Sequence, residues 1–169
     1  KAAIRDSRVQ STRNVVDALG KDVSNETALV NASAVGIYGF RGDEVVDEDG
    51  EAGDDFLARV AVDWENEALR ARERGSRVVL CRFGIVLGRG GGAMDMMLPL
   101  FRWMLGARLG PGDQWFSWIH IRDLVDILIR SIDNPDFAGP VNCTAPHPVT
   151  NSEFTDVLAS VVGRPVLFP

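Results

Sequence analysis

The chain has 169 residues, of which 46% are hydrophobic and 25% are charged, and its formal net charge is -6. This is the composition of an ordinary globular protein, and the length is sufficient for one domain with its own core. The negative charge argues against a protein that a global positive field draws to nucleic acid or to an anionic membrane.

The chain opens with a loosely helical pattern of apolar residues over positions 3–19, and Gly20 follows as a stop signal. Residues 27–32 form a short apolar run that ends in small residues, which is typical of a buried strand in a parallel sheet. The segment from 39 to 53 is polar, acidic and without periodicity. We expect a loop there.

Asp54 and Asp55 precede the clearest helix of the sequence, which has arginines near its end and Gly75 just beyond. These residues suit the caps and the dipole of a helix. Residues 78–83 predict a second buried strand, which residues 85–87 continue, and residues 94–105 predict another apolar helix. On the helix that follows Asp55, the positions that we expect to face inward are Leu57, Val60, Ala61, Trp64 and Ala68.

The last third of the chain continues the alternation of strands and helices, which predicts an α/β fold with a mostly parallel sheet. Residues 115–119 predict a short strand, residues 122–132 an amphipathic helix and residues 140–143 a last strand. Asn151 is predicted to cap a final helix. The inward positions expected on these two helices are Leu124, Val125, Leu128, Ile129 and Ile132, and then Phe154, Val157, Leu158, Val161 and Val162.

A glycine-rich stretch, GRGGGAM at residues 88–94, is similar to a loop whose backbone binds phosphate. A dinucleotide fingerprint, however, needs a second buried strand after its helix and an acidic residue about 20 positions on. The residue 20 positions beyond Gly90 is Gly110, and the segment between them holds no second strand pattern. We therefore expect a flexible connection here, and any main dinucleotide cradle upstream of Lys1.

Ser33 lies at the carboxyl end of the first predicted strand, among the small residues of NASAVGIYG. In open α/β sheets this edge faces the ligand crevice. Small side chains there permit the close approach of a flat ring, and the serine offers a hydroxyl. The alternative is a tight passage from strand to loop that carries no chemistry.

Other classes of site find little support. Cys81 lies in an apolar strand pattern, so we expect a buried, reduced thiol. No histidine, cysteine and carboxylate cluster has the spacing of metal ligands. The sequence contains no signal-peptide pattern and no apolar run near the ~18 residues of a spanning helix, which predicts a cytoplasmic protein.

Five segments stand out in order: SAVGIYG, DDFLARVAVDWE, RFGIVLGRGGGAM, WFSWIHIRDLV and GPVNCTAPHPVTNSEF. Together they resemble the extended short-chain dehydrogenase/reductase superfamily, and within it the branch of NAD-dependent epimerases and dehydratases that includes sugar-nucleotide epimerases. The resemblance covers essentially the whole chain. It implies a Rossmann-like parallel sheet with flanking helices, and an upstream half with a Gly-rich loop that this chain lacks.

The resemblance also implies that the chain contributes to two domains with different functions. Residues 1–85 and 120–135 would be the remainder of the dinucleotide-binding domain, and residues 86–119 and 136–169 a small substrate-binding subdomain. The implied cofactor is NADP or NAD, with NADP favoured. The implied partner is a small molecule such as a nucleotide-sugar, without nucleic acid or membrane, and a homodimer is compatible with the family.

Site residues follow from the same resemblance. Ser33 and Tyr38 are the candidate catalytic residues, since Ser33 falls beside the expected nicotinamide and Tyr38 belongs to a matching Tyr-Gly pair. The positions implied to line the cofactor are Ser33, Ala34, Val35, Arg82, Phe83, Gly84 and Val86.

The sequence departs from the superfamily at its proton shuttle, a tyrosine followed four residues later by a lysine. Such a lysine lowers the pKa of the tyrosine so that it exchanges a proton near neutral pH. Tyr38 is the only tyrosine of this chain, Gly42 stands four residues after it, and the lysines are Lys1 and Lys21. When Glu65 is aligned with the family's acid, the expected tyrosine and lysine positions hold Leu57 and Ala61.

Two classes of function follow. The first is an epimerase or oxidoreductase that acts on a nucleotide-sugar or a similar small molecule with NADP or NAD. The second is a binding or regulatory protein that keeps the dinucleotide fold and has lost standard catalysis, because a fold does not dictate a function.

Overall fold

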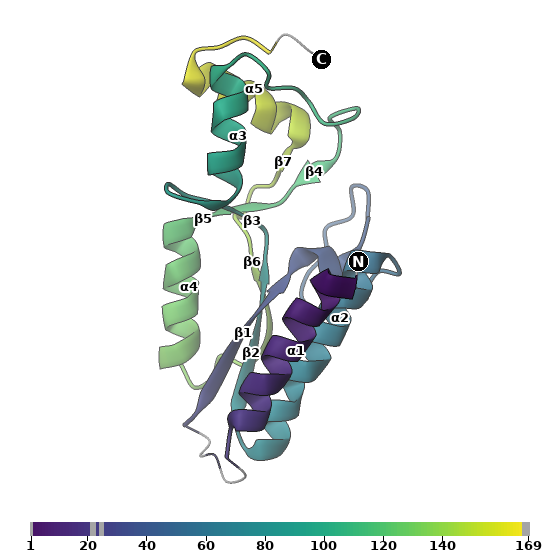
Figure 1. The fold of residues 1–169 in the computed structure, drawn as a ribbon, viewed down its shortest axis with the longest axis vertical. Helices are drawn as coiled ribbons and strands as arrows, with labels where there is room; N and C mark the ends of the chain where they lie inside the picture. Colours follow the sequence, from purple (N-terminus) through teal and green to yellow (C-terminus); the bar gives the residue numbers. More distant parts are fainter. Residues whose placement is uncertain (1, 21–22, 24–25, 167–169) are drawn as a thin grey trace. The chain divides into compact units, whose positions relative to one another are not determined.

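The computed structural model describes residues 2–20, 23 and 26–166 (Figure 1). The chain divides into two compact units. The large unit comprises residues 1–83 and 125–143, and the small unit comprises residues 84–124 and 144–169. The predicted division had placed residues 136–143 in the smaller part; the structure places them in the large unit because their strand pairs with its sheet.

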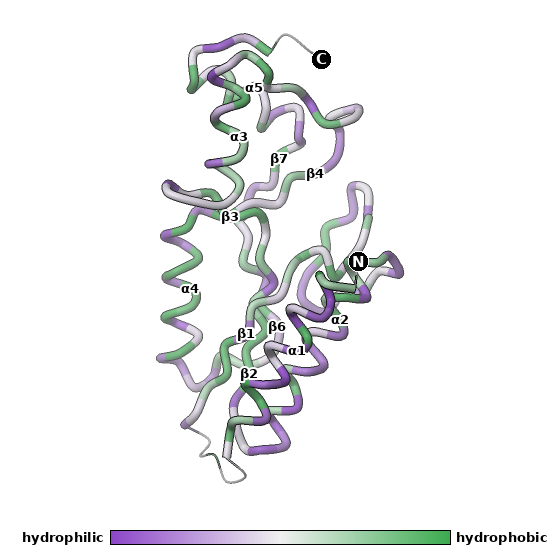
Figure 2. Tube along the Cα trace, viewed as in Figure 1, coloured by the Kyte–Doolittle hydropathy of each residue, from purple (hydrophilic) through white to green (hydrophobic). Residues whose placement is uncertain are grey.

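The large unit contains a three-stranded parallel sheet of β1 (Ala28–Ala34), β2 (Arg77–Phe83) and β6 (Gly139–Cys143), in the order β1-β2-β6. The prediction of a parallel α/β sheet is therefore confirmed. The strands are mostly hydrophobic in Figure 2, as expected where helices cover both faces of a sheet.

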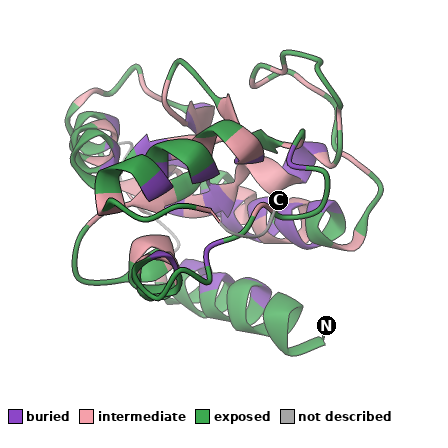
Figure 3. Ribbon diagram, turned by 90° about the horizontal axis from the view of Figure 1, so that it is seen from above, coloured by how far each residue is buried: buried purple, intermediate pink, exposed green. Residues whose placement is uncertain are grey.

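Helices α1 (Ala2–Ala18) and α2 (Phe56–Leu69) lie side by side on one face of this sheet, and α4 (Ile121–Asp133) lies on the other (Figure 1). The short helix η2 (Arg70–Arg74) continues α2. Most of α1 is exposed (Figure 3), and its buried residues are Val9, Thr12 and Val16. The core on this face consists of Val16, Ala68, Ala71, Val78 and Leu80.

Helix α2 begins where the acidic residues predicted it. The side chain of Asp55 accepts hydrogen bonds from the backbone N–H groups of Leu57 and Ala58, at 2.7 and 3.0 Å. The buried stripe is centred on Ala58, Ala61 and Glu65, three and four residues apart. Leu57 lies beside this stripe and is 58% exposed, so the prediction that it faces inward is wrong.

The small unit contains two two-stranded ladders and two helices, α3 (Gly92–Arg102) and α5 (Asn151–Val162). Strand β3 (Ile85–Leu87) pairs in parallel with β5 (Trp118–His120), and β4 (Trp115–Phe116) pairs antiparallel with β7 (Val149–Thr150). The single strand predicted over 115–119 is thus two, because its halves pair with different partners on either side of Ser117. Phe101, Leu158 and Ala159 form the core between α3 and α5.

Two further predictions for the helices need correction. The cap of α5 is Thr150 rather than Asn151: Thr150 Oγ1 accepts from the N–H of Glu153 and Glu153 Oε2 accepts from the N–H of Thr150, which is a capping box. Five apolar residues predicted to face inward are exposed because the apolar arcs of α4 and α5 are wider than the surfaces they pack against. They are Val125, Ile129, Ile132, Val157 and Val161.

Across the described parts of the chain, no helix has both the length and the apolar character that a membrane crossing requires.

Candidate functional site

Three polar side chains stand in one row near the carboxyl ends of the large unit's strands. Ser33 of β1 is the direct lateral partner of Arg82 of β2, and Arg82 is the partner of Asn142 of β6. Lateral partners in a parallel sheet point to the same face. The alternation along β2 places Arg82 on the face of Val78 and Leu80, which is the face that α1 and α2 cover.

Arg82 and Glu65 of α2 form a bidentate, buried ion pair. Arg82 Nε donates to Glu65 Oε1 and Arg82 Nη2 donates to Glu65 Oε2, both at 2.9 Å. Ser33 Oγ donates to Glu65 Oε1 at 2.6 Å. The carboxylate therefore receives donors on both oxygens, which a buried charge needs in order to be stable.

The remaining nitrogen of the Arg82 guanidinium, Nη1, contacts Tyr38. Tyr38 lies in the short helix η1 (Val35–Tyr38), which follows β1. Arg82 Nη1 donates to the Tyr38 hydroxyl at 2.8 Å, and this hydroxyl donates to Asn142 Oδ1 at 2.7 Å. Burial opposes the charge of Arg82, but the hydrogen bonds to Glu65 and Tyr38 outweigh it, so the pKa of the guanidinium lies above its ordinary value. Arg82 is a permanent cation here.

The loop from 39 to 53 is tied to the same arginine. Arg82 Nη1 donates to the backbone oxygen of Glu48 at 2.9 Å, and the N–H of Asn142 donates to Glu48 Oε1 at 2.7 Å. The loop's ends meet where Gly53 N–H donates to Ile37 O at 2.8 Å. The sequence predicts a polar, acidic loop here, and within it Glu48 is half-buried and hydrogen-bonded. We call Ser33, Tyr38, Glu48, Glu65, Arg82 and Asn142 the carboxyl-end network.

The structure thus brings together some of the predicted site residues and separates others. Ser33, Tyr38 and Arg82 lie in the network and are buried, at 3%, 6% and 8% exposure. Gly84 and Val86 belong to the small unit, where Val86 is part of β3. Their contact with a cofactor stays a prediction, as does that of Ala34, Val35 and Phe83.

Sequence reasoning missed Asn142 and Glu48 as members of this network. Asn142 is a polar residue inside the predicted strand 140–143, and that anomaly was the available signal. Glu48 had no such signal, because it stands among six acidic residues between positions 43 and 51 that look alike in sequence.

The exposed part of this edge is lined by compact, uncharged residues. Ala34, Val35 and Gly36 follow Ser33 directly and are each partly exposed. Their side chains are compact and uncharged, and the space beside Gly36 is open, with no described atom within 4 Å of where a Cβ would stand. A planar group can approach the backbone closely at such a place.

Leu57 and Ala61, the positions that the resemblance assigns to the superfamily's tyrosine and lysine, carry no titratable group. Ala61 is buried against Ile37 and Tyr38, and Leu57 is exposed on the first turn of α2. The described residues include no group of three histidine, cysteine or carboxylate side chains that could hold a metal ion. His120 is exposed and its Nδ1 accepts from the N–H of Arg122 at 3.2 Å, as a local turn contact.

Cys81 and Cys143 are free and fully buried on the opposite face of the sheet, as expected of structural thiols. The contact with Cys81 and burial raise the pKa of the Cys143 thiol above its ordinary value. Both thiols are also closed to solvent, since Cys81 and Cys143 are each 0% exposed.

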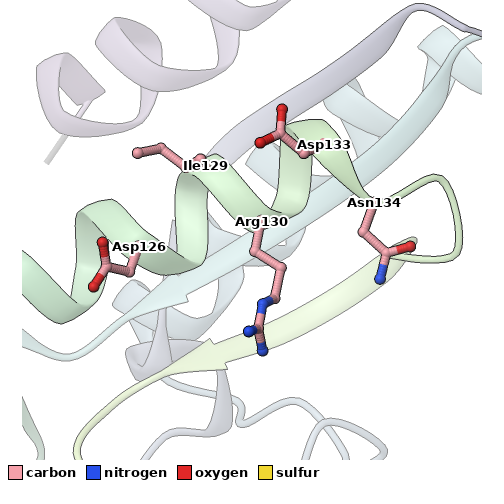
Figure 4. Close-up of a pocket in the computed structure, with 5 residues that line it drawn as sticks. All are labelled: Asp126, Ile129, Arg130, Asp133 and Asn134. Atoms are coloured by element: carbon pink, nitrogen blue, oxygen red, sulfur yellow. The ribbon is translucent and has the colours of Figure 1, made fainter.

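A hollow of about 350 Å³ on α4 lies apart from these residues. Its lining side chains, shown in Figure 4, are Asp126, Ile129, Arg130, Asp133 and Asn134. None of the predicted site residues contributes to it. Its residues all come from one helix and the turn after it, so it is a surface depression rather than a convergent site.

Residues 1–143 match the family model described as the NAD dependent epimerase/dehydratase family. The epimerase family protein Mb2239 of Mycobacterium bovis is 49% identical over 165 residues, which are 98% of this chain and 54% of that protein. The chain thus spans about half the length of the curated relatives it matches.

Two solved structures are also similar. Human epimerase family protein SDR39U1 (isoform 2), solved with NADPH, is 34% identical with a TM-score of 0.88, covering 100% of this chain and 59% of that one. A nucleoside-diphosphate sugar epimerase of Corynebacterium glutamicum is 40% identical with a TM-score of 0.78, covering 95% of this chain and 36% of that one.

Proposed function

This chain belongs to the NAD dependent epimerase/dehydratase family, and from that premise we propose that it acts with NADP(H) on a nucleotide-sugar or a similar small molecule, without a Tyr-x-x-x-Lys pair. The human relative was solved with NADPH, which favours NADP over NAD. The relative from C. glutamicum is described as a nucleoside-diphosphate sugar epimerase, which favours that substrate class.

The observation that carries the proposal is the row of Ser33, Arg82 and Asn142 near the carboxyl ends of three parallel strands. Ligands of open α/β sheets bind beyond those ends. The ion pair of Arg82 with Glu65 fixes the position of Ser33, because a bidentate pair between two buried groups has little freedom to rotate.

In this proposal the residues have distinct tasks. Ala34, Val35 and Phe83 present a compact apolar edge to the nicotinamide ring, which supplies hydride transfer when bound. Ser33 orients the ligand at that edge. The Tyr38 hydroxyl is held between Arg82 and Asn142, so in this proposal it connects β2 to β6 rather than moving to a substrate. Gly84 and Val86 are proposed, separately, as cofactor contacts of the small unit.

Turnover tests the catalytic proposal. The full-length protein, with the segment upstream of Lys1, is incubated with NADP⁺ or NADPH and a panel of UDP-, GDP- and dTDP-sugars, with nicotinamide absorbance and product analysis as readouts. We expect conversion of at least one sugar, and a loss of rate in Ser33→Ala but not in Ser131→Ala, a buried serine whose hydroxyl bonds within α4. An unchanged panel in the wild type counts against this proposal.

A second candidate is a nucleotide-binding protein without catalysis. The observation in its favour is that Leu57 and Ala61 occupy the shuttle positions, while Tyr38 is buried with both hydrogen bonds satisfied. Titration calorimetry with NADPH separates the two: tight binding without any turnover supports the second candidate, and absence of binding rejects both. The cytoplasmic location and the homodimer remain predictions under either.

A further inference from the structure

Helix α3 carries apolar side chains on two opposite faces. Its inner face packs against α5 in the small unit (Figure 1), and the residues of that face are Met94, Met97, Leu98 and Phe101. Its outer face carries Met96 and Leu100, followed by Trp103 at the C-cap, and all three are exposed, Met96 and Trp103 at 77% each. Their spacing of four and three residues places them on one side of the helix. A helix that is apolar all round is normally buried, so we expect a further surface to cover the outer face.

The turn after α3 continues the apolar surface and includes a strained residue. Met104 has a φ of 59°, in the left-handed region, which among the described residues is otherwise occupied by glycine. The N–H of Leu105 donates to the backbone oxygen of Leu100 at 2.8 Å, a helix ending in which glycine usually takes the place of Met104. Glycine would be less strained here, but it would remove an apolar side chain. The exposed apolar residues of this segment, which we call the α3 patch, are Met96, Leu100, Trp103, Met104, Leu105 and Leu109.

Two opposite charges border the outer face of α3. Asp95 lies in the first turn of the helix and Arg102 in its last turn. They are seven residues apart, as are their neighbours Met96 and Trp103, so each pair lies along one side of the helix. Asp95 and Arg102 are both exposed, and within the part of the chain that the structure describes neither has an ion pair or a side-chain hydrogen bond.

We infer that a second copy of this chain covers the α3 patch, with the two α3 helices antiparallel about a two-fold axis near Pro99. Asp95 of one protomer then faces the partner's Arg102, and symmetry forms the same ion pair a second time. Met96 likewise meets the partner's Trp103, a favourable contact of sulfur with an aromatic ring.

The charges of the small unit favour a second copy as the occupant. A helix face with opposite charges at its two ends is complementary to itself when antiparallel, whereas an unrelated partner would need a matching pair of its own. The small unit also has five arginines and five acidic residues, so two copies do not repel each other through this unit. One short helix and its turn make a small interface, which predicts a micromolar dimer.

Charge exchange tests the pairing in the full-length protein. Asp95→Arg and Arg102→Asp each place like charges opposite one another twice, so each variant alone should dimerise about tenfold more weakly than the wild type. In an equimolar mixture every cross pair is again an arginine opposite an aspartate, and we expect heterodimers of nearly wild-type affinity. Sedimentation velocity over a concentration series, with one variant fluorescently labelled, measures both. A helix weakened by either substitution cannot produce this recovery, because mixing does not change the fold of a single chain.

A second pair of variants tests the apolar contact. Leu100→Glu should weaken the dimer by more than about tenfold, because it buries a carboxylate in the interface. Val161→Glu, at a position 79% exposed on α5 of the same unit, should leave the dimer unchanged. Thermal unfolding of each variant confirms that it is folded.

The outcomes are distinct. A wild type that stays monomeric over the whole series overturns the inference, because another part of the full-length chain or a different partner then covers α3. A dimer that Leu100→Glu leaves intact uses another surface and overturns it as well. Single charge variants that do not recover on mixing also overturn it, since the charges then do not meet across a two-fold axis. The proposed function is untouched by these results, because no readout depends on cofactor or turnover.

Discussion

Glu65 is the acceptor on which Arg82 and Ser33 converge, and this makes it the most consequential single side chain of the large unit. Its acidic character was visible in the sequence, and so was its alignment with a family position. Its partners were not, because Ser33, Glu65 and Arg82 are far apart in the chain and meet only through strand register and helix packing. Residue types could be predicted here; pairings could not.

We predict that Glu65→Gln destabilises the protein by about 3 kcal/mol, because it leaves the buried guanidinium of Arg82 without its counter-charge. The measurement is urea unfolding at neutral pH. Asp63→Asn is the matched control, since it makes the same change on the same helix to a pair whose side chains are 48% and 40% exposed. The control is expected to cost less than about 1 kcal/mol. Equal costs for the two variants would mean that burial of the pair is energetically irrelevant.

Between elements, Glu67 connects α1 to α2. Its carboxylate accepts from Arg13 Nη2 of α1 at 2.9 Å and also pairs with Arg70, the first residue of η2. The hydrogen bond from Arg13 is the main reason that the pKa of Glu67 lies below its ordinary value; burial opposes the shift, and Arg70 adds to it.

A carboxyl group whose pKa is lower in the folded state stabilises the protein above its unfolded pKa, about 4.3 for glutamate, and loses this effect as the pH falls through the folded value. We therefore predict a gap in unfolding free energy between wild type and Glu67→Gln that is constant near pH 7 and closes as the pH falls below about 4. Urea unfolding at a series of pH values measures it. In an Arg13→Gln background the gap should be smaller at neutral pH; a gap that persists at pH 3 contradicts the assignment.

Most helices and strands could be predicted from the sequence. Periodicity and acidic caps indicate α2, and apolar runs indicate β1 and β2. The predicted faces were less reliable. Val157 and Val161 have the spacing of a buried stripe on α5, yet they are exposed because Leu158 and Ala159 meet α3 instead. Periodicity identifies an apolar arc, whereas the element packed against it decides how much of that arc is covered.

For the whole molecule, charge is unevenly distributed between the units. The small unit has five arginines and five acidic residues, so its formal charge is zero and the net charge of -6 belongs to the large unit. The predicted ligand is itself an anion. Binding to the large unit must therefore rely on local contacts, because the overall field of that unit opposes it.

We predict that NADPH raises the thermal midpoint more than NADH at equal concentration, in line with the relative solved with NADPH. At a free concentration one hundred times the Kd, NADPH should add about 2.7 kcal/mol to the free energy of unfolding. Differential scanning fluorimetry over a concentration series measures both shifts. Identical shifts would remove the preference for NADP, and UDP alone serves as the control for nonspecific nucleotide effects.

The contact between Tyr38 and Asn142 joins positions 104 residues apart, and it gives the large unit a kinetic property. Contacts between positions so far apart in sequence tend to form late in folding. Closing a large loop costs conformational entropy before the contact can stabilise the chain. Bonds that are absent from the folding transition state barely affect the folding rate, but they must break before the chain can open. Strand β6, which carries Asn142, is therefore expected to slow the unfolding of the large unit without speeding its folding.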